Sequence, residues 1–585
     1  MSHRIVAHVH PSGDADGVTI VPTGETTAAR LAAILTPLLG SPLRRELGAL
    51  RVNGAPLARL ASLDPPELEL LWTPEAHAIA GNRVRAQAAL PRMRDTLARL
   101  REDGAELARR MLADVEGLDV LDEHQLVNVA AMASPDCFGL CVFDEQGTGK
   151  TVTVLHAFDA LVERNLADVI VILAPKSMLA EWRRDFERFH GDLYRIAIVA
   201  GNPRARLEAL SSEADVYIVG FETAVALEAE LVRLVRRSNG RAVLVVDESY
   251  FVKNRSARRS TTARRIREWC ERAYVLCGTP APNAPHDLVA QATLVDFGLA
   301  YAHLDIPDDR DAARPVVRAA LAERGVYVRN LKQDVLPDLP GRRFTRTLVE
   351  FEELQARLYE AARSELVHDL QAIDDPRFAR ELRSFLARRS ALLQIASNPV
   401  GVAPEYDRVP GKLRALDELL GDALGRDEKV VVWSFYTASV DAICARYAHY
   451  GLVRYDGTIT SVEARRDAVR RFQEDDETML FVGNPAAAGA GLTLHRARLA
   501  VYESLSNQAA HYLQSLDRIH RRGQERPVDY LFLLCRGSLE PHEFERLQAK
   551  QAAAHDLLGD QIELPVTREG LLAELLASDD LTAVA

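Results

Sequence analysis

Short, almost wholly apolar runs alternate with longer stretches of helical periodicity along most of this chain. One set of apolar runs spans residues 169–174, 194–199, 216–219, 242–246 and 273–277, and a second set spans 429–434, 479–482, 499–502 and 528–534. Continuous apolar runs of this length, separated by helices, are typical of parallel strands that are covered on both faces. The pattern therefore predicts an α/β fold with two parallel-sheet lobes.

The stretches outside the two sets follow other patterns. Residues 301–410 lack strong strand signals and are rich in helix formers, which predicts a helical insert. Near the start, short strand signals at 18–21 and 68–72 precede a long amphipathic stretch at 83–111, which predicts a small N-terminal α+β accessory domain. The expected divisions are an accessory domain at 1–116, a first lobe at 117–300, the insert at 301–410, a second lobe at 411–540 and a C-terminal helical tail at 541–585. We expect the accessory domain to be separable, and to bind a protein partner or set a preference for a DNA structure.

Composition narrows the class of protein. A chain of 585 residues with 48% apolar and 27% charged residues can bury the cores of two to four domains. No apolar stretch approaches the roughly 18 residues of a membrane span, and the first ten residues do not resemble a signal peptide. We therefore expect a cytoplasmic protein without membrane association. The six cysteines form no Cys-x-x-Cys pair, which indicates neither a disulfide framework nor a zinc site.

Residues 144–151, Asp-Glu-Gln-Gly-Thr-Gly-Lys-Thr, follow an apolar run and open a helical stretch. Such a loop grips a nucleotide phosphate through Gly147, Thr148, Gly149, Lys150 and Thr151. The glycines turn backbone N–H groups toward the phosphates, Lys150 reaches the β- and γ-phosphates, and the Thr151 hydroxyl ligates Mg²⁺. The stricter pattern has a glycine where Asp144 stands, so the motif alone leaves a chance glycine-rich turn open. The loop predicts ATP and Mg²⁺ as cofactors.

A pair of acidic residues, Asp247 and Glu248, ends the apolar run at 242–246. Asp247 could hold Mg²⁺ through water, and Glu248 could orient or deprotonate an attacking water. An acidic strand end that faces solvent is the commoner explanation for such a pair alone. Its position about a hundred residues after the phosphate loop, again at the end of a buried strand, favours the catalytic interpretation.

With these segments in place, the chain resembles the SWI/SNF-type helicase-like ATPases of helicase superfamily two, and more closely the lean bacterial members. The resemblance covers roughly residues 121–540. Its segments, in order, are 121–125, 144–151, 174–182, 247–254, 276–283, 331–340, 429–435, 456–457, 489–494 and 514–524. It implies two RecA-like lobes and ATP hydrolysis coupled to double-stranded DNA.

The resemblance also implies roles for single residues. Gln125 becomes the expected adenine contact, and Gly491 is expected at the nucleotide site. Residues in the matching positions are expected to contact DNA, namely Lys176, Ser177, Thr279, Ser434 and Thr493. Two departures from the family pattern are Tyr250, which stands where the family has histidine, and the absence of a Trp-Asn-Pro segment near 506–509.

The segment 514–524 carries two arginines, Arg518 and Arg521, spaced three residues apart. On a helix this spacing places both on one face, from which they could project toward the γ-phosphate as arginine fingers. A solvated basic helix end is the alternative. Gln514 and Gln524, which frame the segment as in the family, favour the catalytic interpretation for the arginines and for Gln514.

A basic stretch at 253–267 is expected to bind the DNA backbone without sequence preference, since it contains no acidic residue. The residues expected to contact DNA there are Arg255, Arg258, Arg259 and Arg264. The alternative is that these arginines face acidic neighbours from elsewhere in the chain. The net charge of −12 does not itself favour DNA binding, but it can coexist with a local basic surface.

Taken together, the segments predict an ATP-dependent translocase on double-stranded DNA, in a setting such as anti-phage defence or DNA repair. Two alternatives remain open from the sequence. One is a strand-separating helicase of the same superfamily, and the other is a nucleotide-gated DNA-binding subunit that recruits partners and turns over slowly.

Overall fold

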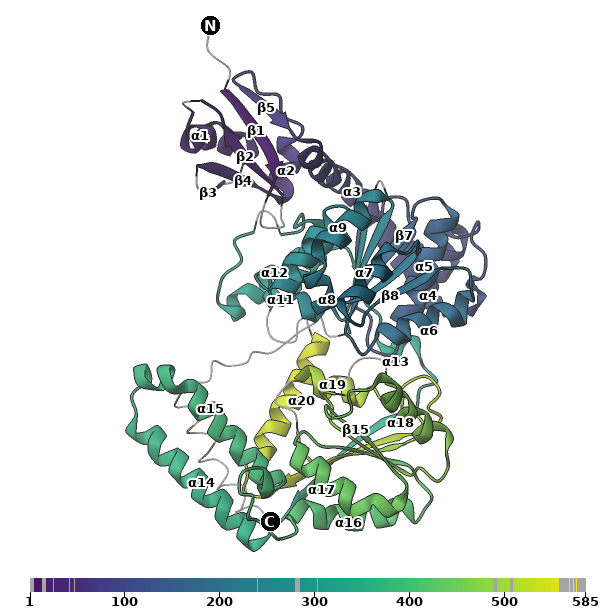
Figure 1. Ribbon diagram of the computed structural model, residues 1–585, viewed down its shortest axis with the longest axis vertical. Coiled ribbons are helices and arrows are strands. Elements are labelled where there is room, and N and C mark those ends of the chain that lie inside the picture. Colours follow the sequence, from purple (N-terminus) through teal and green to yellow (C-terminus); the bar gives the residue numbers. More distant parts are fainter. Residues whose placement is uncertain are drawn as a thin grey trace. The chain divides into compact units, whose positions relative to one another are not determined.

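The computed structural model describes residues 5–12, 17–24, 26–40, 43–46, 48–238, 240–278, 285–301, 304–487, 492–505 and 509–556, together with 568, 572 and 575. They belong to two compact units, Met1–Val335 and Leu336–Ala585 (Figure 1). This division falls inside the stretch 301–410 for which we expect a helical insert. Among the described residues, no helix combines the length and hydropathy needed to cross a membrane.

The first unit begins with a small module around a mixed five-stranded sheet in the order β3-β4-β2-β1-β5. Its elements are β1 (Ile5–Pro11), β2 (Val18–Pro22), α1 (Ala28–Leu39), β3 (Arg44–Glu46), β4 (Ala49–Val52), α2 (Gly54–Leu60) and β5 (Leu68–Trp72). Buried and exposed positions alternate along β1, as expected for a sheet that packs one face on a core. Leu31 and Leu35 of α1 lie in that core. The expected α+β fold of the N-terminal region is confirmed.

The long helix α3 (Pro74–Met111) joins this module to the first parallel sheet. Its buried Arg83 donates to both carboxylate oxygens of Glu268, at 2.6 and 2.5 Å, and Asn82 donates to the Glu268 backbone oxygen at 2.6 Å. Trp269 packs against the core of the N-terminal module. Breaking a buried ion pair by removing one partner costs about 3–5 kcal/mol. These contacts argue against the expectation that residues 1–116 are separable.

Seven strands, all paired in parallel, form the sheet of the first lobe in the order β12-β6-β11-β10-β7-β9-β8. The strands are β6 (Gly139–Val142), β7 (Val169–Ala174), β8 (Ile196–Val199), β9 (Val216–Gly220), β10 (Ala242–Val246), β11 (Arg272–Leu276) and β12 (Tyr327–Val328). Every position of β6, β7, β9, β10 and β11 is buried, which requires cover on both faces. Helices supply that cover: α4 (Glu123–Met132), α5 (Lys150–Glu163), α6 (Leu179–His190), α7 (Pro203–Ser211), α8 (Phe221–Ala226), α9 (Glu228–Arg237), α10 (Arg258–Arg267) and α11 (Pro285–Asp296). Helices α12 (Arg310–Arg324) and α13 (Lys332–Val335) complete the unit.

The second unit holds a six-stranded parallel sheet in the order β13-β18-β17-β14-β16-β15. Its strands are β13 (Arg342–Val349), β14 (Val430–Trp433), β15 (Leu452–Tyr455), β16 (Leu480–Gly483), β17 (Leu499–Tyr502) and β18 (Val528–Cys535). Its helices are α14 (Glu353–Ala372), α15 (Asp375–Ser397), α16 (Gly411–Leu424), α17 (Thr437–Tyr447), α18 (Val462–Glu474), α19 (Ala509–Leu516) and α20 (Glu540–Asp556). With the first unit, this confirms the expected α/β class with two parallel-sheet lobes.

The stretch 301–410 contains two strands as well as helices. β12 pairs with β6 in the first unit, and β13 is an edge strand of the second sheet. β13 escapes hydrophobic pattern analysis because most of its side chains are exposed and three of its eight residues are arginines. Within the stretch, α14 and α15 pack side by side as a helical pair (Figure 1), and Leu575 from the C-terminal region is buried in their core.

Candidate functional site

Four neighbouring parallel strands of the first unit, β6, β11, β10 and β7, end at the same edge of the sheet. Each strand is followed by a segment that the sequence singles out. The phosphate loop follows β6, Gly278 lies two residues beyond β11, Asp247 and Glu248 follow β10, and Lys176 and Ser177 follow β7. In open parallel sheets, ligands bind outside the carboxyl ends of the strands. The phosphate loop, the acidic pair and the exposed Lys176 and Ser177 therefore follow strands that end at one edge of the sheet.

The phosphate loop turns through two glycines in the left-handed region, Gly147 at φ 87° and Gly149 at φ 90°. A side chain at Gly149 would also overlap the Gln125 amide. Lys150, the first residue of α5, donates from Nζ to the backbone oxygens of Asp144 at 2.8 Å and Glu145 at 3.1 Å. The loop thus leads into the N-terminus of α5, and the Lys150 side chain bonds back to the loop. A helix N-terminus of this kind favours anion binding.

Gln125 forms hydrogen bonds with the phosphate loop. Its Oε1 accepts from the Asp122 backbone N–H at 2.9 Å, and its Nε2 donates to the Thr148 backbone oxygen at 3.1 Å. The His124 ring contacts the same oxygen through Nε2 at 2.9 Å. Both ends of the buried Gln125 amide are therefore engaged with the protein. The adenine contact stays a prediction.

Asp144, which replaces the glycine of the stricter motif, is buried and structural. Its carboxylate accepts from the Asn128 side chain at 2.6 Å and from the Asn330 backbone and side chain, both at 2.9 Å. Burial raises the pKa of Asp144, and nearby Lys150 opposes that shift. The carboxylate thus joins the loop to the segment after β12. The sequence carried no signal for this contact, because Asp144 and Asn330 are 186 residues apart.

Asp247 accepts two hydrogen bonds in a buried position. The indole N–H of Trp182 donates to Oδ2 at 2.9 Å, and the Glu248 backbone N–H donates to Oδ1 at 2.8 Å. Burial raises the pKa of Asp247, while the Trp182 bond and Lys150 act in the opposite direction. Trp182 belongs to α6, which begins just after the exposed Lys176 and Ser177. The expected Mg²⁺ carboxylate is therefore held by the helix that follows the expected DNA contacts.

Glu248 adopts the left-handed conformation at φ 46°, which is rare for a residue with a side chain. Such a conformation costs about 1–3 kcal/mol and is concentrated at functional sites. Its Oε1 accepts from the Gln146 side chain at 3.0 Å. Gln146 is a site residue that our sequence analysis missed, although it stands in the middle of the phosphate loop.

Tyr250 follows Asp247 and Glu248 in a small aromatic stack. Its ring centroid is 4.6 Å from that of Phe251, which stacks on Phe221 at 5.2 Å. The neighbouring Ser249 is buried and donates to the Gln291 side chain at 2.5 Å, so the acidic segment is bonded to α11.

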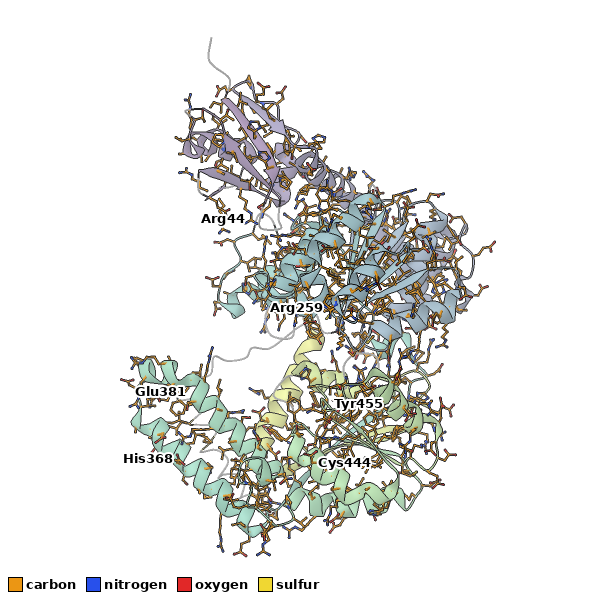
Figure 2. All side chains as sticks on the ribbon, in the orientation of Figure 1. Arg44, Arg259, His368, Glu381, Cys444 and Tyr455 are labelled. Atoms are coloured by element: carbon orange, nitrogen blue, oxygen red, sulfur yellow. The ribbon has the colours of Figure 1, made fainter. Side chains whose placement is uncertain are left out.

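Acidic partners from other helices meet part of the basic stretch. Arg259, labelled in Figure 2, pairs with Glu222 of α8, and Arg265 pairs with Glu228 of α9. Arg267 is fully buried and donates to backbone oxygens, including those of Phe138 and Val295. For Arg259 and Arg265 the acidic-neighbour alternative holds, whereas Arg267 is bonded to backbone oxygens inside the unit. The acids were missed because they lie 37 residues away in sequence.

Two members of the basic stretch, Arg255 and Arg258, are exposed, and Arg264 is half-buried. Arg264 donates to the Arg255 backbone oxygen at 2.9 Å, which fixes the turn before α10. Arg258 is the first residue of α10. Contact with a DNA backbone stays a prediction for this stretch, and Arg255 and Arg258 are best placed for it.

The two candidate arginine fingers lie in the second unit, in a turn that follows α19. The helix ends at Leu516, so the expectation of a shared helical face is wrong. The two residues converge nevertheless, because Arg518 and Arg521 each donate from Nη1 to the Leu492 backbone oxygen, at 3.4 and 3.1 Å. Arg521 also donates to the Thr493 hydroxyl at 2.8 Å. Arg518 and Gln514 are buried, whereas Arg521 is partly exposed.

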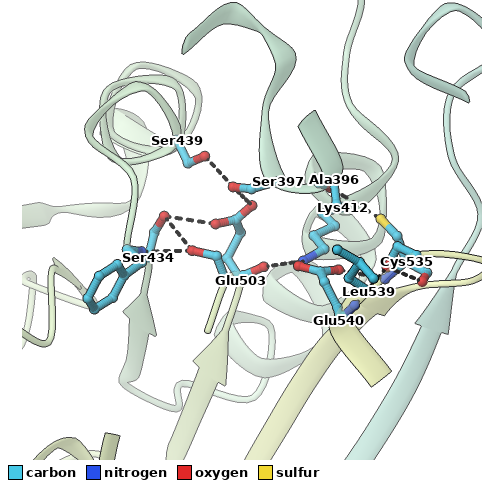
Figure 3. A network of polar contacts seen from close by, with 12 residues as sticks. Ala396, Ser397, Lys412, Ser434, Ser439, Glu503, Cys535, Leu539 and Glu540 are labelled. Atoms are coloured by element: carbon cyan, nitrogen blue, oxygen red, sulfur yellow. Dashed lines mark hydrogen bonds and ion pairs between the residues drawn. The ribbon is translucent and has the colours of Figure 1, made fainter. Parts of the chain in front are cut away.

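Ser434, an expected DNA contact, has no exposed surface and belongs to a buried polar network (Figure 3). Its hydroxyl donates to Glu503 Oε2 at 2.8 Å, and the Ser397 hydroxyl donates to Glu503 Oε1 at 2.7 Å. Lys412 donates to the Glu503 backbone oxygen at 2.6 Å and to Glu540 at 2.5 Å. The Ser434 hydroxyl is thus used inside the unit, and its DNA contact stays a prediction. Two other expected site residues, Thr279 and Gly491, lie outside the described residues.

Comparisons with known proteins match most of the chain. A model of the SNF2-related domain matches residues 123–399, and a model of the helicase conserved C-terminal domain matches residues 411–523. A "SWI/SNF-related matrix-associated actin-dependent regulator of chromatin subfamily A-like protein 1" from Xenopus tropicalis is 25% identical over 429 residues, which cover 70% of this chain and 42% of that protein. An "Uncharacterized ATP-dependent helicase" from Mycoplasma pneumoniae is 24% identical over 430 residues, covering 72% of this chain and 40% of that protein.

Among solved structures, the chain is similar to a "Sulfolobus solfataricus SWI2/SNF2 ATPase core in complex with dsDNA", with 19% identity and a TM-score of 0.34. That match covers 80% of this chain and 98% of the archaeal one. The chain spans about two fifths of the length of the curated relatives named above.

Proposed function

Since the chain belongs to the SNF2-related helicase-like ATPases, we propose that it hydrolyses ATP in response to double-stranded DNA and translocates along the duplex. The observation that carries the proposal is the shared edge of the first sheet. There the phosphate loop with Lys150, the carboxylates of Asp247 and Glu248, and the exposed Lys176 and Ser177 follow neighbouring strands.

Each residue has a chemical role in this proposal. Lys150 exchanges its two backbone carbonyl partners for the β- and γ-phosphate oxygens of ATP. Glu248 accepts a proton from the attacking water, whose oxygen bonds to the γ-phosphorus as the bond to the bridging oxygen of ADP breaks. Arg521, the more exposed of the two arginines in the second unit, is proposed to stabilise the charge on the transferred phosphoryl group.

The residues present fit a bound Mg²⁺. Thr151 lies in the first turn of α5. The Asp247 carboxylate accepts from Trp182 at Oδ2 and from the Glu248 N–H at Oδ1, so lone pairs remain for a hydrated cation. Mg²⁺ supplies neutralisation of the charge that develops on the phosphates. The hydrogen bond from Trp182 holds the Asp247 carboxylate in place, and Thr151 would offer its hydroxyl oxygen to the cation.

Exposed basic side chains support duplex DNA as the partner. Lys176 stands at the end of β7, and Arg255 and Arg258 stand beyond β10, the strand paired with β7. Contacts of this kind bind phosphates without reading bases, as a protein that moves along DNA requires. We propose in addition that the outer face of the N-terminal sheet, where His8 lies between Val21 and Leu71, binds a protein partner.

The test compares ATP turnover by the full chain with duplex DNA, single-stranded DNA and RNA, alongside displacement of a third strand from a triplex. We expect duplex DNA to stimulate turnover most and ATP to drive triplex displacement without separation of a forked duplex. Separation of the forked duplex would instead establish a strand-separating helicase. Binding of duplex DNA without turnover would establish the recruitment subunit.

A further inference from the structure

Gln146 lies between three segments of the candidate site. It belongs to the phosphate loop, its Nε2 donates to Oε1 of Glu248 at 3.0 Å, and its side chain packs against Gly278 beyond β11. Any side chain at Gly278 would overlap the Gln146 side chain, so the close packing depends on glycine at that position. Gln146 is half-buried, and Glu248 is only 7% exposed.

The contact acts on a carboxylate whose backbone is already constrained. Glu248 sits at φ 46°, and its N–H is bonded to Oδ1 of Asp247. A left-handed residue fixes the direction in which its side chain leaves the backbone, but the side-chain torsions of a glutamate remain to be set. The Gln146 amide supplies a donor that sets them.

We propose that Gln146 is a positioning residue that orients the Glu248 carboxylate for its work on the attacking water. This inference rests on the proposed ATPase function and extends it by one residue. Because Gln146 is part of the loop that holds the phosphates, the orientation of Glu248 is tied to the conformation of that loop. Catalytic groups must be held in place by neighbours whose own conformations are fixed, and a misplacement of about 1 Å can cost 10²-fold in rate.

The chemistry of the contact explains why an amide suits this position. A glutamine donates to a carboxylate without carrying a charge, so it can hold Glu248 without neutralising it. A methionine has a similar length but no donor. A glutamate would place a second carboxylate against the first, which raises the pKa of one of the pair.

The first experiment replaces Gln146 by methionine in the full chain and measures steady-state ATP hydrolysis with saturating duplex DNA. We expect kcat to fall by about 10- to 100-fold, with the KM for ATP and the affinity for a fluorescent ATP analogue changed by less than about threefold. Gln146→Glu should lose as much, because it removes the donor. Gln87→Met, the same change at an exposed position of α3, is the control and should leave kcat unchanged.

A double-mutant cycle separates positioning from a general structural role. In a Glu248→Gln background, single-turnover hydrolysis should not fall further when Gln146→Met is added, because Gln146 acts through the Glu248 carboxylate. Equal losses in both backgrounds would overturn the inference, since they would mean that Gln146 supports the loop independently of Glu248. Thermal unfolding midpoints within a few degrees of the parent exclude loss of folding as the cause.

The same assays distinguish failure of this inference from failure of the proposed function. If Lys150→Ala and Glu248→Gln abolish hydrolysis while Gln146→Met retains the parental kcat, the inference is wrong and the ATPase stands. If Lys150→Ala and Glu248→Gln hydrolyse ATP normally, the proposed function fails, and the inference fails with it.

Discussion

Lys150 and Lys412 occupy similar places in the two units, yet they are held in different ways. Each lies in the first turn of a helix beside carboxylates of its own unit. Lys150 is half-buried, and its Nζ donates to two uncharged backbone oxygens. Lys412 has no exposed surface and is paired with the Glu540 carboxylate.

The difference shows how one architecture serves two purposes. Backbone oxygens hold an ammonium group weakly enough that phosphate oxygens can replace them. A buried ion pair does not exchange its partner for a ligand easily, because separating the pair leaves an uncompensated buried charge. Burial alone would lower the pKa of Lys412, but its acidic neighbours, led by Glu540, together raise that pKa. The first unit thus keeps its lysine available for a ligand, whereas the second uses its lysine as internal support.

The largest expected effect is a loss of stability when Lys412 is replaced. Lys412→Met leaves the buried Glu540 without its cation and should destabilise the second unit by about 3–5 kcal/mol. Hydrogen exchange of peptides from β14 and β18 measures the loss, because those strands belong to the core around Lys412. Lys150→Met is the matched control and should leave exchange of the same peptides unchanged. Equal protection in both variants would break the comparison.

ATP hydrolysis should depend on Lys150 and Glu248. Lys150→Ala and Glu248→Gln should each reduce ATP turnover by at least about 10²-fold, because each removes a positioned group from the reaction. Glu248→Gln should still bind ATP, as measured by equilibrium binding of a fluorescent analogue. Normal turnover by either variant would show that the shared sheet edge is not the site of the chemistry.

Trp182 sharpens the comparison, because it links the segment after β7, with its exposed Lys176 and Ser177, to the buried Asp247 carboxylate. Trp182→Phe keeps an aromatic side chain but removes the N–H donor to Asp247, and should raise the Mg²⁺ concentration for half-maximal turnover by about tenfold. Burial already raises the pKa of Asp247, and losing this bond raises it further. The ionised form is then lost at higher pH, so the acid limb of the activity profile should move upward. An unchanged Mg²⁺ dependence would remove Trp182 from the site.

The smallest expected effect distinguishes two arginines of the same helix. Arg258 is exposed, whereas Arg259 pairs with Glu222 and lies 5.4 Å above the Phe251 ring. If Arg258 contacts a phosphate, Arg258→Ala should lower the slope of log affinity against log salt by about 0.9, and Arg259→Ala should lower it less. Duplex binding titrated from low to moderate salt provides the slopes. Equal slopes for both variants and the parent would show that DNA binds elsewhere.

The sheets could be predicted from sequence where burial on both faces leaves a continuous apolar run, as at β7 and β10. β13 could not, because an exposed edge strand carries no such run. Contacts between distant residues left no pattern either, which is why the Asp144–Asn330 bonds and the acidic partners of Arg259 and Arg265 went unseen. The location of Asp247 and Glu248 beside the phosphate loop could be predicted, because neighbouring parallel strands end at one edge of the sheet. The contact between Gln146 and Glu248 could not be predicted, since it depends on the directions of the two side chains.

The segment after β12 connects the phosphate loop to the end of the first unit through hydrogen bonds. Backbone bonds run from β6 into the loop, with Phe143 N–H donating to Val328 O at 3.0 Å and Glu145 N–H donating to Asn330 O at 2.9 Å. The Lys332 N–H then donates to the Glu145 side chain at 2.7 Å, and the unit ends three residues later at Val335. The chain therefore passes from the first unit to the second through residues that are bonded to the expected phosphate loop. In the proposed DNA translocase, we expect an opposing load on the DNA to reach the nucleotide site through these hydrogen bonds.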